Sequence, residues 1–171
     1  MKKKEEKSLE KSPKRQVITI GAILEIPISN EYFVYAQILE HGLYAFFDFR
    51  SVTPIRDYMV LQNTSILFII GVYNYVVNKC IWRKVGKLPI RKELVNVPMM
   101  YIYDFTTDKF SLYDCETGTI IPATKEQARG LERCAVWAEN HVEDRIRDYY
   151  NHVPCIWLEE HYALFPESLP K

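Results

Sequence analysis

The periodicity of the apolar residues changes once along this chain, close to Pro122. Before Pro122, short β-branched and aromatic runs separated by turn residues predict strands. After it, residues 122–150 predict two capped amphipathic helices joined at Trp137. Because strands come first and helices last, we expect an α+β fold. In this fold a mostly antiparallel, strongly bent sheet from the N-terminal two-thirds carries two C-terminal helices packed against it.

Both expected helices begin with a capping pattern. Thr124 precedes Gln127 by three residues, so each side chain can bond the other residue's backbone N–H. Asn140 and Glu143 repeat this spacing at the start of the second helix. Apolar residues at helical spacing then define the buried faces: Ala128, Leu131 and Ala135 in the first helix, and Val142, Ile146, Tyr149 and Tyr150 in the second.

The strands are expected in short alternating or continuous apolar runs. The first three are joined by connections short enough for hairpins, which predicts an antiparallel meander. The expected strands are residues 17–28, 32–39, 43–49, 65–73, 81–85, 98–105, 109–114 and 119–121.

The charge of the chain is balanced overall but unevenly placed. A length of 171 residues, 48% of them hydrophobic, favours one domain with a real core. Basic and acidic side chains number 22 each, and this balance argues against general nucleic-acid binding. Residues 1–16 hold seven basic and three acidic side chains and are expected to be a disordered basic tail. Residues 17–171 are expected to form a single, mildly acidic domain.

Cysteine use and hydropathy favour a cytoplasmic protein. The four cysteines form no CxxC pair, and in a chain with an ample core they are expected to be reduced thiols. The basic start does not read as a signal peptide, because acidic residues interrupt it and Glu25 ends the apolar run that follows. The apolar run at 66–77 is too short to span a membrane.

Three carboxylates are the best candidates for acid–base chemistry. Asp48, Asp104 and Asp114 lie beside aromatic strands, where burial can raise the pKa of a carboxyl group. Aspartates at strand ends more often cap turns. None of the glycine-rich, nucleophile-elbow or H-E-x-x-H motifs occurs in the chain. We therefore expect no catalytic residue.

Two groups of side chains have a superficial likeness to metal ligands. His141, Asp144 and Asp148 fall on one face of the second expected helix, although acids in a first turn are also favoured by the helix dipole. His152, Cys155 and His161 match no standard zinc spacing. We expect no metal and no cofactor. The alternative is a small enzyme that uses Asp48 or a metal held by His141, Asp144 and Asp148.

Several short sequence motifs suggest a family. They are GAILEIPI from Gly21, YAQIL, AFFDF, WRKVGKLP from Trp82, GLERCAVW from Gly130, and HVEDRIRDYY from His141. With these motifs the chain resembles the immunity protein 26 family of bacterial polymorphic toxin systems. The likeness covers roughly residues 17–158. Ala22 stands where the family pattern has an acid, which puts any role of that acid in doubt here.

The resemblance implies a small cytoplasmic immunity protein, a monomer or weak homodimer, that binds and neutralises a cognate toxin. The acidic body suits a basic toxin, and neither nucleic acid nor membrane is an expected partner. The toxin-contacting residues are unknown. We expect the family-like residues to be architectural, with internal ion pairs for Glu132, Arg133 and Arg145. They are Gly21, Pro27, Trp82, Gly86, Pro89, Gly130, Leu131, Glu132, Arg133, Trp137, Glu143, Asp144 and Arg145.

Overall fold

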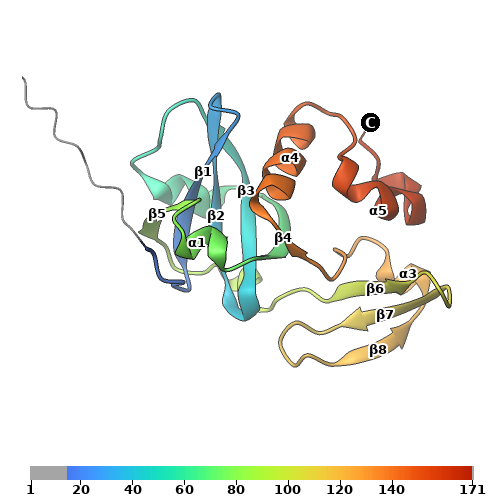
Figure 1. Cartoon of the computed structure of the whole chain (residues 1–171). Helices are drawn as coiled ribbons and strands as arrows, with labels where there is room; N and C mark the ends of the chain where they lie inside the picture. The colour runs from blue at the N-terminus through green and yellow to red at the C-terminus, as the bar shows by residue number, and fades with distance from the viewer. Residues whose placement is uncertain (1–14, 171) are drawn as a thin grey trace, which may run out of the picture.

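The computed structural model describes residues 15–170, and within them nine strands form two sheets (Figure 1). The α+β class predicted from the sequence is confirmed. The first sheet has the order β5-β1-β2-β3-β4-β9 and contains β1 (Ala22–Ile28), β2 (Tyr32–Ile38), β3 (Leu43–Ser51), β4 (Ile66–Val72), β5 (Arg83–Lys87) and β9 (Val136–Trp137). The second sheet has the order β6-β7-β8 and contains β6 (Met100–Asp104), β7 (Lys109–Tyr113) and β8 (Ile120–Ala123).

The expectation of one sheet was wrong, and the reason lies in the pairing of β6. This strand pairs with β7 on one side and forms a bridge from Tyr101 to Arg133 on the other, so it does not extend the first sheet. Within the first sheet all pairs are antiparallel except β4 with β9. The register shifts in three of these pairs, between β1 and β5, β2 and β3, and β3 and β4. Such shifts bend strands and increase their twist.

The helices are short except for one. Most of the described helices have four to six residues, and α4 has 12. They are α1 (Tyr75–Asn78), α2 (Lys92–Val95), α3 (Lys125–Ala128), α4 (Glu139–Tyr150) and α5 (Glu159–Leu164). Short 3-10 helices lie at Glu40–Gly42, Tyr58–Asn63, Ile156–Leu158 and Pro166–Ser168. No helix within residues 15–170 has the length and apolar character needed to cross a bilayer.

Helix α3 confirms the predicted cap but not the predicted length. The capping box is present, with Thr124 N–H donating to Gln127 Oε1 at 2.8 Å and Gln127 N–H donating to Thr124 Oγ1 at 3.3 Å. The helix ends at Ala128. Gly130 follows at a φ of +77°, and Glu132 and Cys134 then bond the backbone of Tyr101. Pairing with β6 therefore replaces the helix that was expected to continue toward Ala135.

Helix α4 also begins earlier than predicted. Its N-cap is Ala138, which has no side-chain cap, so Asn140 lies inside the helix. The chain reaches Ala138 in extended conformation because Trp137 belongs to β9 and pairs with Val72 of β4. The predicted apolar stripe is confirmed for Val142 and Ile146, both fully buried.

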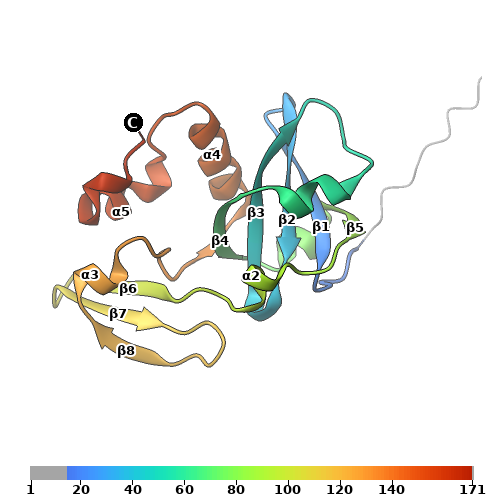
Figure 2. The same cartoon turned by 180° about the vertical axis from the view of Figure 1, so that it is seen from behind.

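The main core lies between the first sheet and α4. Val142 and Ile146 of α4 pack with alternate residues of β1, β2, β3 and β4 and with Trp82. Helix α5 and the turn after it cover the second sheet instead, because Phe165 and Leu164 pack against Tyr101 and Phe110. Figures 1 and 2 show α4 against the first sheet and α5 on the side of the second. The C-terminal segment therefore bridges the two sheets.

The N-terminal boundary differs from the prediction. Residues 1–14 of the expected tail lie outside the described residues. Gln16, also assigned to the tail, is buried. Its Nε2 donates to Val77 O at 3.1 Å and to Trp82 O at 2.8 Å, and its Oε1 accepts from Lys84 N–H at 2.7 Å. A glutamine that saturates three backbone groups in this way is part of the fold.

Two family-like glycines are required by close packing. Gly21 has a φ of +82°, and a Cβ built there would lie 2.9 Å from Leu88 O. A Cβ at Gly86 would lie 2.9 Å from the Tyr58 ring. Any larger residue at either site would push against backbone or a packed ring.

Candidate binding site

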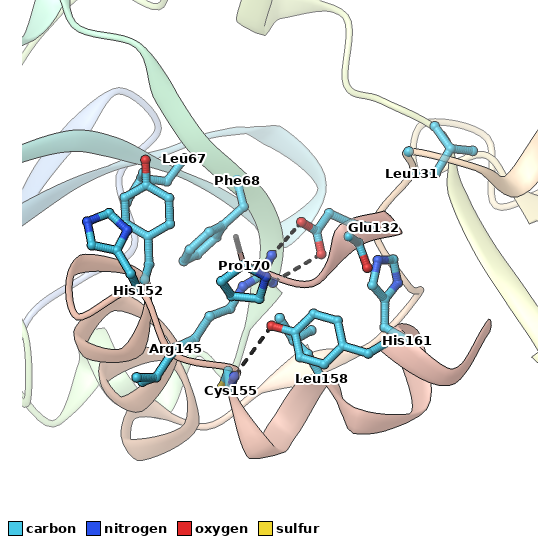
Figure 3. A pocket seen from close by; sticks show the side chains of 15 residues that line it. Leu67, Phe68, Leu131, Glu132, Arg145, His152, Cys155, Leu158, His161 and Pro170 are labelled. Atoms are coloured by element: carbon cyan, nitrogen blue, oxygen red, sulfur yellow. Dashed lines mark hydrogen bonds and ion pairs between the residues drawn. The ribbon is translucent and has the colours of Figure 1, made fainter. Parts of the chain in front are cut away.

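A cleft of about 480 Å³ opens between β4, α4, α5 and the loop after α3 (Figure 3). We call it the C-terminal cleft. Its wall is mainly apolar, and two charged side chains, Glu132 and Arg145, and two histidines, His152 and His161, also line it. The lining residues include Leu67, Phe68, Leu131, Glu132, Arg145 and His161. A cavity with an apolar wall and a few convergent polar groups is the usual form of a binding site.

The polar centre of the cleft is an ion pair between α4 and the loop after α3. Arg145 Nη1 donates to Glu132 Oε2 at 3.0 Å, and Nη2 donates to Glu132 Oε1 at 2.6 Å. Only 11% of the Arg145 side chain and 25% of the Glu132 side chain are exposed. The guanidinium lies 4.0 Å from the centre of the Phe68 ring. This bidentate, stacked arrangement fixes α4 to the loop.

The expected internal ion pairs are thus found for Glu132 and Arg145 but not for Arg133. Arg133 pairs with Glu160 of α5 at the surface, where 36% and 58% of the two side chains are exposed. The expectation was wrong for Arg133 because its neighbour Glu132 turns toward α4 while its own backbone bridges to β6.

His161 lies beside Glu132 in the cleft and contacts the second sheet. Its Nδ1 is 2.9 Å from the hydroxyl of Tyr101. Burial lowers the pKa of His161 and raises the pKa of Tyr101 to about 12. Both side chains are therefore neutral near pH 7, which suits a buried bond between α5 and β6.

Acidification is expected to destabilise the protein through His161. Because burial depresses its folded-state pKa below the ordinary 6.5, its contribution to stability is full above pH 6.5 and is lost as the pH falls toward the folded pKa. We expect the free energy of unfolding, measured by urea denaturation from pH 8 to 5, to decline below about pH 6.5. His161→Gln should flatten this decline.

The matched control is His152→Asn. His152 is exposed and has a φ of +55°, a conformation that asparagine tolerates well. This variant should keep the wild-type decline. An unchanged slope in His161→Gln would assign the acid sensitivity to other groups.

A second cavity of about 280 Å³ adjoins the cleft and shares Glu132, Leu158 and His161 with it. Trp157 and His141 line it. Their rings are stacked, with centroids 3.5 Å apart and planes at 22°. Trp157 Nε1 also donates to Asp144 Oδ2 at 3.0 Å. The indole is therefore held in place although 43% of Trp157 is exposed.

The metal site that was the alternative interpretation of this helix face is not formed. His141 stacks on Trp157, while Asp144 and Asp148 both accept hydrogen bonds from Arg147, at 2.7 and 3.2 Å. The hydrogen bond from Trp157 and the Arg147 guanidinium lower the pKa of Asp144. Among residues 15–170, no three His, Cys, Asp or Glu side chains are grouped so that they could hold a metal ion. His152, Cys155 and His161 line one cleft without forming such a group.

The three candidate carboxylates for acid–base chemistry have structural partners. Asp48 accepts from the hydroxyls of Tyr149 and Tyr150 at 3.3 and 3.2 Å, which joins β3 to α4. Asp104 and Asp114 each cap a turn by accepting from backbone N–H groups and a threonine hydroxyl. These bonds, led by the threonine hydroxyls, lower the pKa of Asp104 and of Asp114.

The remaining family-like residues lie in the first sheet and its contact with α4. Trp82 is fully buried, and its Nε1 donates to Glu143 Oε1 at 2.8 Å. Burial raises the pKa of Glu143, and the bond from Trp82 opposes this. Pro27 pairs with Phe33 across β1 and β2, and Pro89 O accepts from Gln62. The sequence pattern singled out Trp82 but gave no role to Trp157, whose exposure depends on how α4 and the following turn fold.

Comparison with known proteins identifies the family. A family model described as Immunity protein 26 matches residues 19–112. This match contains β1 to β6 and most of β7, and it ends before GLERCAVW and HVEDRIRDYY. No curated protein and no solved structure matches the chain significantly. Since the match spans more than half of the 171 residues, the chain belongs to the immunity protein 26 family.

Proposed function

We propose that this protein is the immunity partner of a bacterial toxin, which it binds and neutralises in a one-to-one complex without chemistry of its own. The observation that carries the proposal is membership of an immunity protein family, which implies an antitoxin role. We place this activity in the cytoplasm, with residues 16–170 acting as one domain and as a monomer or weak homodimer before the toxin binds.

The partners of the candidate catalytic groups support binding over catalysis. Asp48 is engaged by two tyrosine hydroxyls, and His141, Asp144 and Asp148 are engaged by Trp157 and Arg147. These contacts join strands, helices and turns. The charge supports a basic toxin, because residues 17–171 hold nineteen acidic and fifteen basic side chains.

The test is a titration of the cognate toxin with this protein. We expect toxin activity to fall linearly with added protein and to vanish at one equivalent, as for a tight complex of standard interface size. Complete inactivation by a small fraction of an equivalent would indicate an enzyme and contradict the proposal, as would full toxin activity at a large excess. Asp48→Asn should neutralise as well as wild type, since Asp48 has no chemical role in this mechanism.

A further inference from the structure

We propose that the surface around Trp157 is where the toxin docks, and that it receives a basic segment of the toxin with an arginine side chain placed against the indole. This proposal rests on the proposed function and adds the contact surface to it. We call the surface the Trp157 face and define it by Val136, His141, Asp144, Ile156, Trp157 and Glu159.

The first observation is a group of exposed apolar side chains beside a cavity. Val136 is 55% exposed, Ile156 is 64% exposed and Trp157 is 43% exposed. Val136, His141 and Trp157 line the 280 Å³ cavity that adjoins the C-terminal cleft. Trp157 and Ile156 belong to the same 3-10 turn, directly before α5. Large apolar groups around a concavity are the usual centre of a protein interface.

The second observation is that the indole is held before any partner arrives. His141 stacks on one side of the Trp157 ring, and Asp144 accepts the indole N–H. Asp144 is itself held by Arg147. An anchor whose rotamer is already fixed loses little entropy on binding, so its contact area is converted into affinity efficiently.

The third observation is the sign of the surrounding charge. Residues 139–170 contain seven acidic and two basic side chains. Both basic side chains are engaged, Arg145 by Glu132 and Arg147 by Asp144 and Asp148. Arg133, which lines the same cavity, is paired with Glu160 of α5. Glu159, which follows the Trp157 turn, is exposed. An arginine approaching Trp157 would meet an aromatic ring and a negative field together, which is the combination that favours a guanidinium.

The surface chemistry can be tested with a hexa-arginine peptide as the probe. Titration into the ¹⁵N-labelled full chain should move the indole N–H resonance of Trp157, while that of Trp82, which is fully buried and does not line this cavity, stays fixed. Glu159→Lys should weaken this response about threefold to tenfold, and 0.5 M salt should suppress it. Glu31→Lys, a charge reversal at an exposed site in the β1–β2 turn, should leave the response of the Trp157 resonance unchanged. No movement at Trp157, or an equal response to hexaglutamate, would overturn the arginine assignment.

The docking role is tested with the toxin itself. Trp157→Ala should weaken toxin binding about thirtyfold or more, the loss typical of a central aromatic anchor. Met59→Ala, which removes a 57% exposed apolar side chain from the Tyr58–Asn63 helix, away from this face, should leave toxin binding unchanged. If wild type neutralises the toxin and Trp157→Ala does so equally well, the face is wrong and the proposed function stands. If wild type does not neutralise, the function itself fails.

A second copy of the chain is the other possible occupant of this face, and the same variants distinguish it. Sedimentation of wild type at increasing concentration is expected to show no dimer that depends on Trp157. A dimer that Trp157→Ala abolishes would assign the face to self-association and overturn the proposal.

Discussion

Trp82→Ala is expected to lower the free energy of unfolding by about 3–5 kcal/mol. Trp82 is fully buried in the main core and meets the Phe46 ring edge-on, with centroids 5.8 Å apart. Its removal leaves a cavity beneath the first sheet. The substitution also removes the indole N–H that donates to Glu143. This hydrogen bond joins the segment directly before β5 to α4. Urea denaturation followed by circular dichroism measures the loss.

Trp82→Phe separates the packing of Trp82 from its hydrogen bond. The phenyl ring keeps most of the apolar volume but has no N–H, so Glu143 keeps its burial and loses its donor. We expect a loss of about 1–3 kcal/mol, the penalty for leaving a buried acceptor unpaired. The pKa of Glu143 should also rise further, because the bond from Trp82 opposes the effect of burial. An NMR titration of the Glu143 carboxyl carbon reads this shift.

The matched control is Trp157→Ala, which removes the same side chain from a surface position. It should change the unfolding free energy by no more than about 1 kcal/mol. Similar losses for Trp82→Ala and Trp157→Ala would contradict the core assignment. The same comparison shows whether reduced toxin binding by Trp157→Ala reflects a lost contact, because the variant must remain folded for that interpretation.

Local patterns in the sequence predicted the parts of the fold that depend on near neighbours. The meander of β1, β2 and β3 follows from alternating apolar residues and short turns, and the Thr124 cap follows from the spacing to Gln127. The length of α3 could not be predicted in this way, because the chain after it forms backbone hydrogen bonds with Tyr101, about 30 positions earlier. Tyr101 N–H donates to Glu132 O, and Cys134 N–H donates to Tyr101 O. Gln16 was misassigned for the same reason, since its partners are more than 60 positions away.

The candidate site is formed even more by contacts between residues that lie far apart in the sequence. The ion pair of Arg145 with Glu132 was expected from polar residues on amphipathic helices, but the cleft around it was not. Trp157 could be recognised as a candidate contact residue only from its contacts with His141 and Asp144 of α4, which hold the indole in place at the surface. A tryptophan in an irregular segment gives no local signal of whether it will be buried or exposed.

Arg145→Met is expected to lower the free energy of unfolding by about 2–4 kcal/mol. Removing one partner of a buried pair leaves the other charge without compensation, which typically costs about 3–5 kcal/mol. We expect somewhat less because 25% of the Glu132 side chain reaches solvent. Methionine retains an unbranched apolar chain to lie against Phe68, so the loss reports mainly on the charge.

A double-mutant cycle with Glu132→Gln tests whether the pair itself is responsible. If the uncompensated Glu132 carboxylate causes the loss, Arg145→Met in the Glu132→Gln background should cost about 1–2 kcal/mol less than in wild type. The matched surface control is Arg133→Met, whose partner Glu160 is 58% exposed, and it should cost less than about 1 kcal/mol. Equal losses for Arg145→Met in both backgrounds would mean that the guanidinium stabilises the fold through Phe68 and Trp137 alone. The cleft would then owe its shape to cation–π stacking, and neutralising Glu132 would leave α4 in place.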